Sequence, residues 1–124
     1  MRGDVYLEIK LVRSHGETFF VYQSPTRIYK ERISDIIYFE RGGRRVTMLS
    51  CASGAVELYG SLSQIYRLLS PEGFEYINQS VIVNFFHITN VKNNCVKISD
   101  GNSIEISRGK RQLIMNRFCD IINK

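Results

Sequence analysis

The chain contains no tryptophan, only two prolines and only three cysteines among its 124 residues. The cysteines are Cys51, Cys95 and Cys119, which are widely spaced and form no C-x-x-C pair. This odd, scattered set argues against a disulfide framework and against a zinc site, which needs a cluster of Cys and His ligands. We therefore expect free thiols that are buried in the fold and kept reduced.

Long apolar runs are also missing. No stretch approaches the roughly 20 residues that a membrane-spanning helix requires. The first residues, Met1–Asp4, are not followed by the apolar core of a signal peptide. We therefore expect a cytoplasmic protein that does not insert into a membrane.

Catalytic motifs are absent as well. The chain contains no G-x-S-x-G, no H-E-x-x-H, no phosphate-binding loop and no acidic metal cluster. Its two histidines, His15 and His87, do not lie in the pattern of a metal site or of a nucleophile–base pair. The sequence therefore predicts a protein that is not an enzyme and has no cofactor or metal, with surface or packing roles for the histidines.

Acidic residues are outnumbered by basic ones. There are 12 Asp and Glu against 17 Lys and Arg, so the formal net charge is +5 and the pI is about 9.3. A pI above roughly 9 meets the electrostatic criterion for a nucleic-acid-binding domain. Solubility alone explains such a charge equally well, so the motifs have to decide between the two explanations.

The residues that are present favour β structure in one folded domain, 1–124. Seven Tyr, seven Phe and a hydrophobic content of 44% are typical of a globular, strand-rich chain. The clearest hairpin has strict alternation at 96–98 and 104–106, with Asp100-Gly101 between them. We expect about nine or ten short strands, drawn from the extended patterns at 5–12, 18–22, 26–30, 36–39, 46–50, 55–59, 74–77, 81–84, 88–92, 96–98 and 104–106.

Two segments have helical spacing instead. In Leu62–Leu69 the apolar residues recur every three or four positions, Ser61 and Gln64 form a capping box, and Pro71 follows. A second helix is predicted over 109–123, with one apolar face. We expect that face to pack on the domain through Leu113, Phe118 and Ile122, although exposure for dimerisation is an alternative.

Polar side chains stand where strands give way to turns. Asn78, Gln79 and Ser80 precede the β-branched run at 81–83, and Ser107-Arg108 ends the last predicted strand. Asn or Gln can pair with two atoms of adenine, and Arg can pair with two atoms of guanine. These positions suggest a small, mostly β, DNA-binding domain.

Four ordered segments carry a family resemblance. They are ISDIIYFE at 33–40, LYGSL at 58–62, GFEYINQSVIVN at 73–84 and IEISR at 104–108. In order and spacing, over 18–111, the chain resembles the LytTR family, the LytR/AgrA-type DNA-binding domain of bacterial response regulators.

The resemblance implies a fold and a function. The fold is mostly β, an elongated antiparallel β-sandwich of about ten short strands with one short internal helix and a C-terminal helix. Loops at strand ends, and not a recognition helix, enter successive major grooves of direct repeats in promoter DNA and so regulate transcription. The implied partners are double-stranded promoter DNA, a second copy on the DNA, and a receiver domain or sensor-kinase pathway. With no receiver domain before the match, we expect an excised effector domain or a stand-alone regulator.

The same resemblance carries three contact regions onto this chain. They are the turn after Glu40, the polar trio at 78–80 and the segment that follows the strand at 104–106. We expect three residues to contact bases: Arg45, Gln79 and Arg108. We expect six to contact the DNA backbone or support the contacts: Arg44, Asn78, Ser80, Ser107, Lys110 and Arg111. Where the family often has His, this chain has Asn78, which removes a possible positive charge.

Four of these residues also have a structural interpretation. Arg44 and Arg45 can belong to a solvated hairpin tip, Gln79 can stabilise its own turn, and Arg108 can form a surface salt bridge with Glu105 or Asp100. Asn84 is predicted to be structural, and Phe85-Phe86 to be core. At the level of function, the alternatives are a single-stranded nucleic-acid-binding β-barrel and a protein-interaction module whose charge is incidental.

Overall fold

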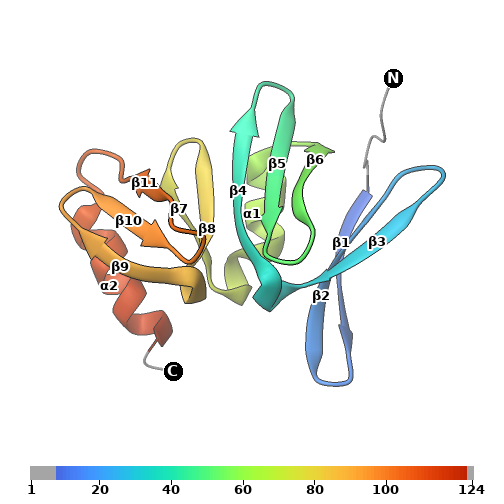
Figure 1. Ribbon diagram of the computed structural model, residues 1–124, viewed down its shortest axis with the longest axis horizontal. Helices are drawn as coiled ribbons and strands as arrows, with labels where there is room; N and C mark the ends of the chain where they lie inside the picture. The colour runs from blue at the N-terminus through green and yellow to red at the C-terminus, as the bar shows by residue number, and fades with distance from the viewer. Residues whose placement is uncertain (1–7, 123–124) are drawn as a thin grey trace.

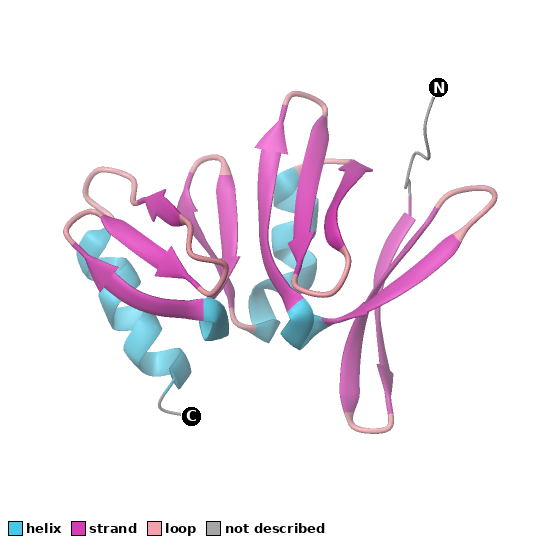
Figure 2. Ribbon diagram, in the orientation of Figure 1, coloured by secondary structure: helices cyan, strands magenta, loops and turns pink. Residues whose placement is uncertain are grey.

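The computed structural model describes residues 8–122, which form three antiparallel sheets and two α-helices (Figures 1 and 2). The sheets follow one another along the long axis of the molecule, with the N-terminal sheet at one end and α2 at the other. Within this range there are eleven strands, so the predicted class, an elongated, mostly β sandwich with an internal and a terminal helix, is confirmed.

The N-terminal sheet has three strands in the order β1-β2-β3: β1 (Glu8–Ser14), β2 (Glu17–Gln23) and β3 (Ile28–Arg32). The β1–β2 turn consists of His15 and Gly16, both at positive φ, as a two-residue hairpin turn of this hand requires. Alternation along β2 directs Phe20 and Tyr22 into the first core. The strand predicted over 5–12 is observed from Glu8 onward, and 5–7 lie outside the described residues.

The central sheet has five strands in the order β6-β5-β4-β8-β7. Its strands are β4 (Ile36–Gly42), β5 (Arg45–Ser50), β6 (Gly54–Tyr59), β7 (Phe74–Asn78) and β8 (Val81–Asn84). Every residue of β8 is buried because the sheet is covered on both faces at this strand. Ile82 enters the core shared with the N-terminal sheet and α1, whereas Val81 and Val83 enter the core shared with the C-terminal sheet and α2.

The C-terminal sheet has the order β11-β10-β9. Its strands are β9 (Ile88–Lys92), β10 (Cys95–Ile98) and β11 (Ser103–Glu105), and α2 (Arg111–Ile122) packs beside them. Three short 3-10 turns connect the layers: η1 (Ile33–Asp35), η2 (Ser70–Glu72) and η3 (Phe85–His87). His87, in η3, contacts both η1 and the turn after β10. Its ring nitrogens lie 2.6 Å from the carbonyl oxygen of Ser34 and 2.7 Å from Oγ of Ser99.

The helix α1 (Leu62–Leu69) has the predicted bounds. The hydroxyl oxygen of Ser61 accepts a hydrogen bond from the backbone N–H of Gln64 at 3.1 Å, which satisfies one of the free donors at the helix start. After η2 the chain turns at Gly73, at φ 92°, where an added Cβ would lie 2.9 Å from Cε2 of Phe86. Glycine is therefore needed there both for its backbone and for its size.

Three burial predictions are wrong. Leu113 is 63% exposed, because α2 turns Ile114 and Ile121 toward the core and Leu113 lies about 100° away from them around the helix. The side chain of Ile122 lies outside the described residues. Phe86 is 65% exposed although Phe85 is buried, since η3 sends the two neighbouring side chains in different directions. The three free thiols are not buried: Cys51 and Cys119 are exposed and Cys95 is half-buried.

Candidate nucleic-acid interface

Three connections lie along one edge of the molecule, the upper edge in Figure 1. They are the β4–β5 turn at Gly43–Arg44, the β7–β8 turn at Gln79–Ser80, and the segment 106–110 between β11 and α2. The three predicted contact regions, which are far apart in the sequence, are thus brought to the same side of the fold.

Backbone hydrogen bonds join these connections. The N–H of Arg41 donates to the carbonyl oxygen of Ser80 at 2.8 Å, which links the first turn to the second. The N–H of Ser107 donates to the carbonyl oxygen of Ile77 at 3.0 Å, which links the second turn to the segment 106–110. The relative positions of the three connections are therefore determined by the backbone as well as by side-chain packing.

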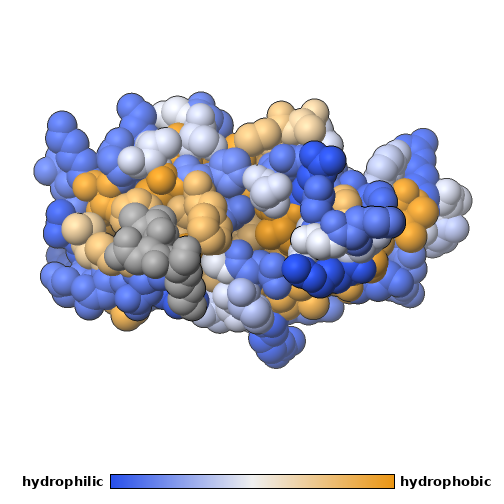
Figure 3. All heavy atoms as spheres, turned by 90° about the horizontal axis from the view of Figure 1, so that it is seen from below, coloured by the Kyte–Doolittle hydropathy of each residue, from blue (hydrophilic) through white to orange (hydrophobic). Residues whose placement is uncertain are grey.

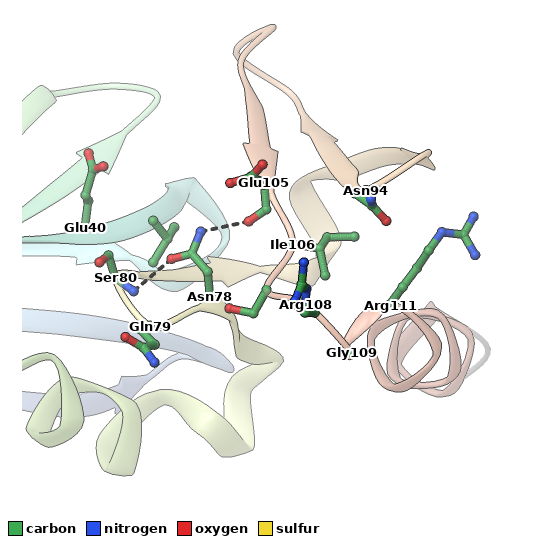
Figure 4. Close-up of a pocket in the computed structure, with 12 residues that line it drawn as sticks. Glu40, Asn78, Gln79, Ser80, Asn94, Glu105, Ile106, Arg108, Gly109 and Arg111 are labelled. Carbon is green, nitrogen blue, oxygen red and sulfur yellow. Dashed lines mark hydrogen bonds between the residues drawn. The ribbon is translucent and has the colours of Figure 1, made fainter.

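Asn78 adds a side-chain link at the same junction (Figure 4). Its Nδ2 donates to the carbonyl oxygen of Glu105 at 2.8 Å, and its Oδ1 accepts from the N–H of Ser80 at 2.8 Å. Both ends of the amide are occupied within the protein. The geometry therefore gives Asn78 a positioning role, holding the β7–β8 turn against the end of β11.

A hollow of about 750 Å³ separates the β7–β8 turn from the segment 106–109. Gln79 and Ser80 line one side of it and Arg108 the other (Figure 4). The side chains of Gln79 and Arg108 have no hydrogen bond or ion pair with any residue in 8–122, and both are exposed. The alternative salt bridge of Arg108 with Glu105 or Asp100 is not formed in this part of the chain.

The two arginines of the first turn differ in their surroundings. Arg44 is exposed and makes no ion pair within residues 8–122. Arg45 begins β5, and its Nη1 donates to Oε1 of Glu57 at 2.8 Å while its Nη2 donates to the hydroxyl oxygen of Tyr59 at 3.4 Å. These two hydrogen bonds, that to Tyr59 first, raise the pKa of Arg45. Its guanidinium is thus held along β6, whereas that of Arg44 is unpaired.

The basic residues at the start of α2, Lys110 just before it and Arg111 at its first position, contact neighbouring elements. The Nζ of Lys110 lies 5.8 Å from the centre of the Tyr76 ring. The Nε of Arg111 donates to the carbonyl oxygen of Asn93 at 2.7 Å, in the β9–β10 turn. Ser107 is half-buried, and its carbonyl oxygen accepts from the N–H of Lys110 at 3.0 Å, which shapes the turn before the helix.

Asn84 has the structural role predicted for it. It is 1% exposed, and its Nδ2 donates to the carbonyl oxygens of Ile33 and Ile36 at 3.3 and 3.0 Å. Its Oδ1 accepts from the N–H of Phe86 at 3.1 Å. These bonds hold η1 and η3 against the end of β8.

Sequence reasoning missed two carboxylates at the interface. Glu40 and Glu105 also line the hollow, and Figure 4 shows them on its two sides, with Asn78 between them. The charge of Glu40 contributes, after burial, to the raised pKa of Tyr38. The alternation of Ile104, Glu105 and Ile106 could have indicated an outward Glu105, but nothing in the sequence places it opposite Glu40.

Figure 3 shows the molecule from below, the side opposite the three connections. In this view, apolar residues are visible across much of the surface between hydrophilic ones.

No helix within 8–122 is long and apolar enough to cross a membrane. In the same range no group of three or more His, Cys, Asp or Glu side chains is arranged to hold a metal ion.

Comparison with known proteins identifies the fold and the family. Residues 26–118 match the family described as the LytTr DNA-binding domain. A solved structure, the LytTr DNA-binding domain of a methyl-accepting/DNA response regulator from Bacillus cereus, superposes with a TM-score of 0.67 at 15% identity. The match covers 80% of this chain and 94% of the other. No curated protein matches the chain. The family match spans most of the chain and the shared fold agrees with it, so the chain belongs to the family of LytTr DNA-binding domains.

Proposed function

We propose that this chain binds double-stranded promoter DNA sequence-specifically and regulates transcription, with the three connections of the upper edge entering successive major grooves of direct repeats. One observation carries the proposal: Gln79 and Arg108 are exposed and unpaired in one hollow, between two connections that the backbone holds in register. Exposed, preorganised side chains of these types suit contact with base edges.

The surroundings of each side chain support a division of roles. Arg108 pairs with a guanine and Gln79 with an adenine. Arg44, Ser80, Lys110 and Arg111 contact phosphates and set the register of the protein on the duplex. Arg45 is less available for a base contact, because its donors are engaged by Glu57 and Tyr59. Arg44, which is unpaired within residues 8–122, is more available for a phosphate contact. Asn78 and Ser107 position the connections.

The proposal includes partners besides DNA. Direct repeats would place two copies of the chain on one promoter, in the same orientation. Response regulators couple such a domain to a phosphorylated receiver, so a receiver domain or a sensor-kinase pathway would supply the signal. The function requires no reaction chemistry and no cofactor.

Arg108→Ala tests the base contact. We expect the variant to lose about 1–3 kcal/mol of binding free energy for its preferred sequence and to lose preference at one base pair. Selection from random duplex pools at physiological salt, followed by sequencing, measures both effects. Arg67→Ala is the matched control, because Arg67 is an exposed arginine of α1 that does not line the hollow.

The same selection distinguishes the rival functions. Enrichment of two repeats in the same direction supports the proposal. Equal loss of specific and random binding by Arg108→Ala contradicts base contact by this residue. Preference for single strands in a competition favours the single-stranded binder, and no salt-sensitive binding of any nucleic acid favours the protein-interaction module.

A further inference from the structure

Glu105 stands at the DNA-facing hollow in a fixed position. It is the last residue of β11, pairs in register with Cys95 on β10, and its carbonyl oxygen accepts from Nδ2 of Asn78 at 2.8 Å. Its neighbours Ile104 and Ile106 pack in the core shared with the C-terminal sheet and α2, so the alternation of the strand directs the carboxylate away from that core. The backbone of Glu105 is therefore joined both to β10 and to the β7–β8 turn.

The carboxylate of Glu105 has no partner among the side chains of residues 8–122. It is exposed and makes no hydrogen bond or ion pair even with Arg108 and Arg111, which line the same hollow. Glu40 contributes a second unpaired carboxylate from the other side of the hollow (Figure 4). Negative charge thus lies beside Gln79 and Arg108 in a chain whose net charge is +5.

This arrangement opposes simple attraction to a polyanion. A phosphate group that enters the hollow meets two carboxylates and is repelled by them, whereas a base edge carries no net charge. A carboxylate also accepts hydrogen bonds only, and among base edges in the major groove it suits the N4 amino group of cytosine. The electrostatics of the hollow therefore favour base edges over phosphates.

We propose that Glu105 is a specificity-determining residue: it excludes phosphates from the hollow and accepts a hydrogen bond from the N4 amino group of a cytosine next to the base pair that Arg108 contacts. This inference rests on the proposed function and deepens it. The cations at the rim attract the backbone of the duplex, and Glu105 restricts what enters between them.

The experiment compares Glu105→Gln with the wild-type chain by selection from duplex pools and by titration of selected and random duplexes. The substitution keeps the shape and the acceptor oxygen but removes the charge and adds a donor. We expect affinity for random duplex to rise roughly two- to fivefold, the effect of one exposed charge. We expect the cytosine preference to relax toward adenine, which an amide pairs with, and the specificity ratio to fall roughly fivefold or more.

Two further variants separate the parts of the inference. Glu105→Asp keeps the charge but withdraws the acceptor by one methylene, so it should bind random duplex as weakly as the wild type while losing the cytosine preference. Glu72→Gln is the control, because Glu72 lies in η2, away from the hollow. It removes the same charge and should change neither property beyond a small general gain in affinity.

The outcomes distinguish this inference from the proposed function. A wild-type chain that enriches no sequence overturns the proposed function and the inference with it. A wild-type chain that does enrich a sequence, and a Glu105→Gln variant with the same preference at every position and the same specificity ratio, overturn the inference alone. A random-duplex gain that Glu72→Gln reproduces in full overturns the phosphate exclusion.

Discussion

Among single residues, Asn78 shows how much of this interface is internal architecture. Its amide has two N–H donors and one oxygen acceptor; one N–H binds the carbonyl oxygen of Glu105, and the oxygen accepts from the N–H of Ser80. A side chain that is engaged twice within the protein is poorly placed to contact DNA directly. The contribution of Asn78 is therefore the link between the β7–β8 turn and the end of β11. It does not depend on the positive charge that a histidine could bring to this position.

Asn78→Asp tests that link. The carboxylate keeps an acceptor for the N–H of Ser80 but loses the donor to the carbonyl oxygen of Glu105. We expect the free energy of unfolding to fall by about 0.5–1.5 kcal/mol, because the carbonyl oxygen of Glu105 loses its hydrogen-bond donor. Urea unfolding at neutral pH measures this, with Gln79→Glu as the control one position away. Equal unfolding midpoints for the two variants would show that the link contributes nothing to stability.

At this scale the sequence predicts which residue types stand at strand ends but not which of them are engaged. The motif order located Gln79 and Arg108, and both are exposed as expected. It could not show that Arg45 is held by Glu57 and Tyr59, because that contact depends on the register of β5 with β6. It also gave no indication that Glu40 and Glu105 face one hollow, since β4 and β11 lie in different sheets.

Among the elements, β7 links both helices behind the interface. Oε1 of Glu75 on β7 accepts from the hydroxyl group of Tyr66 on α1 at 2.9 Å, and Oε2 accepts from Nε of Arg117 on α2 at 2.8 Å. One carboxylate thereby connects α1, β7 and α2. Because β7 leads directly into the turn with Gln79, these bonds also support that turn.

The burial of Tyr66 and its hydrogen bond to Glu75 make the free energy of unfolding depend on pH in the alkaline range. Burial, followed by the hydrogen bond to Glu75, raises the pKa of Tyr66 above its usual value of 10.0. The unfolded chain therefore releases the phenol proton at lower pH than the folded protein does. Stability from this group is complete below about pH 10 and is lost as the pH rises through the higher folded-state pKa.

We accordingly expect the thermal midpoint of the wild-type chain to fall as the pH is raised from 9 to about 11, and to fall less in Tyr66→Phe. Circular dichroism melts at closely spaced pH values measure the difference. Tyr59→Phe, in which an exposed tyrosine of β6 is removed, provides the comparison. Parallel curves for the wild type and Tyr66→Phe would exclude Tyr66 as a source of the pH dependence.

Element boundaries were predictable where several local signals agreed. The bounds of α1 followed from its cap, its apolar spacing and the proline after it. The apolar face of α2 was harder to identify, because Leu113 and Ile114 are adjacent and only packing decides which of them faces the core. The 3-10 turn at Phe85–His87 had no signal strong enough to separate the buried Phe85 from the exposed Phe86.

For the whole molecule, the net charge of +5 does not by itself define a DNA-binding surface. Some cations are engaged in ion pairs, such as Arg32 with Glu17 at 2.9 Å in the N-terminal sheet. Others, such as Arg44 and Arg108, are unpaired in residues 8–122 and lie at the connections of the upper edge. The location of charge should therefore influence DNA binding more than its sum does.

Lys110→Ala and Lys30→Ala test this statement, because both lower the net charge by the same amount. Lys110 lies in the segment before α2, and Lys30 lies on β3, over the ring of Phe19 at 4.6 Å. We expect Lys110→Ala to weaken binding to all duplexes and to reduce the slope of log affinity against log salt by about 0.9, the loss of one phosphate contact. Fluorescence anisotropy at several salt concentrations gives the slope. Identical slopes for the two variants would mean that only total charge matters.

In the proposed complex, the hydrogen-bonded edge would also determine which partner has to adapt. Two backbone hydrogen bonds, from Arg41 to Ser80 and from Ser107 to Ile77, join the three connections. The spacing between the connections therefore changes little unless these bonds break. A stiff protein edge leaves the double helix to bend or twist until its grooves match that spacing. The ease of this deformation depends on the base steps between the contacted positions, with pyrimidine–purine steps the most pliable. Bases that no side chain reaches would thus still influence where the protein binds.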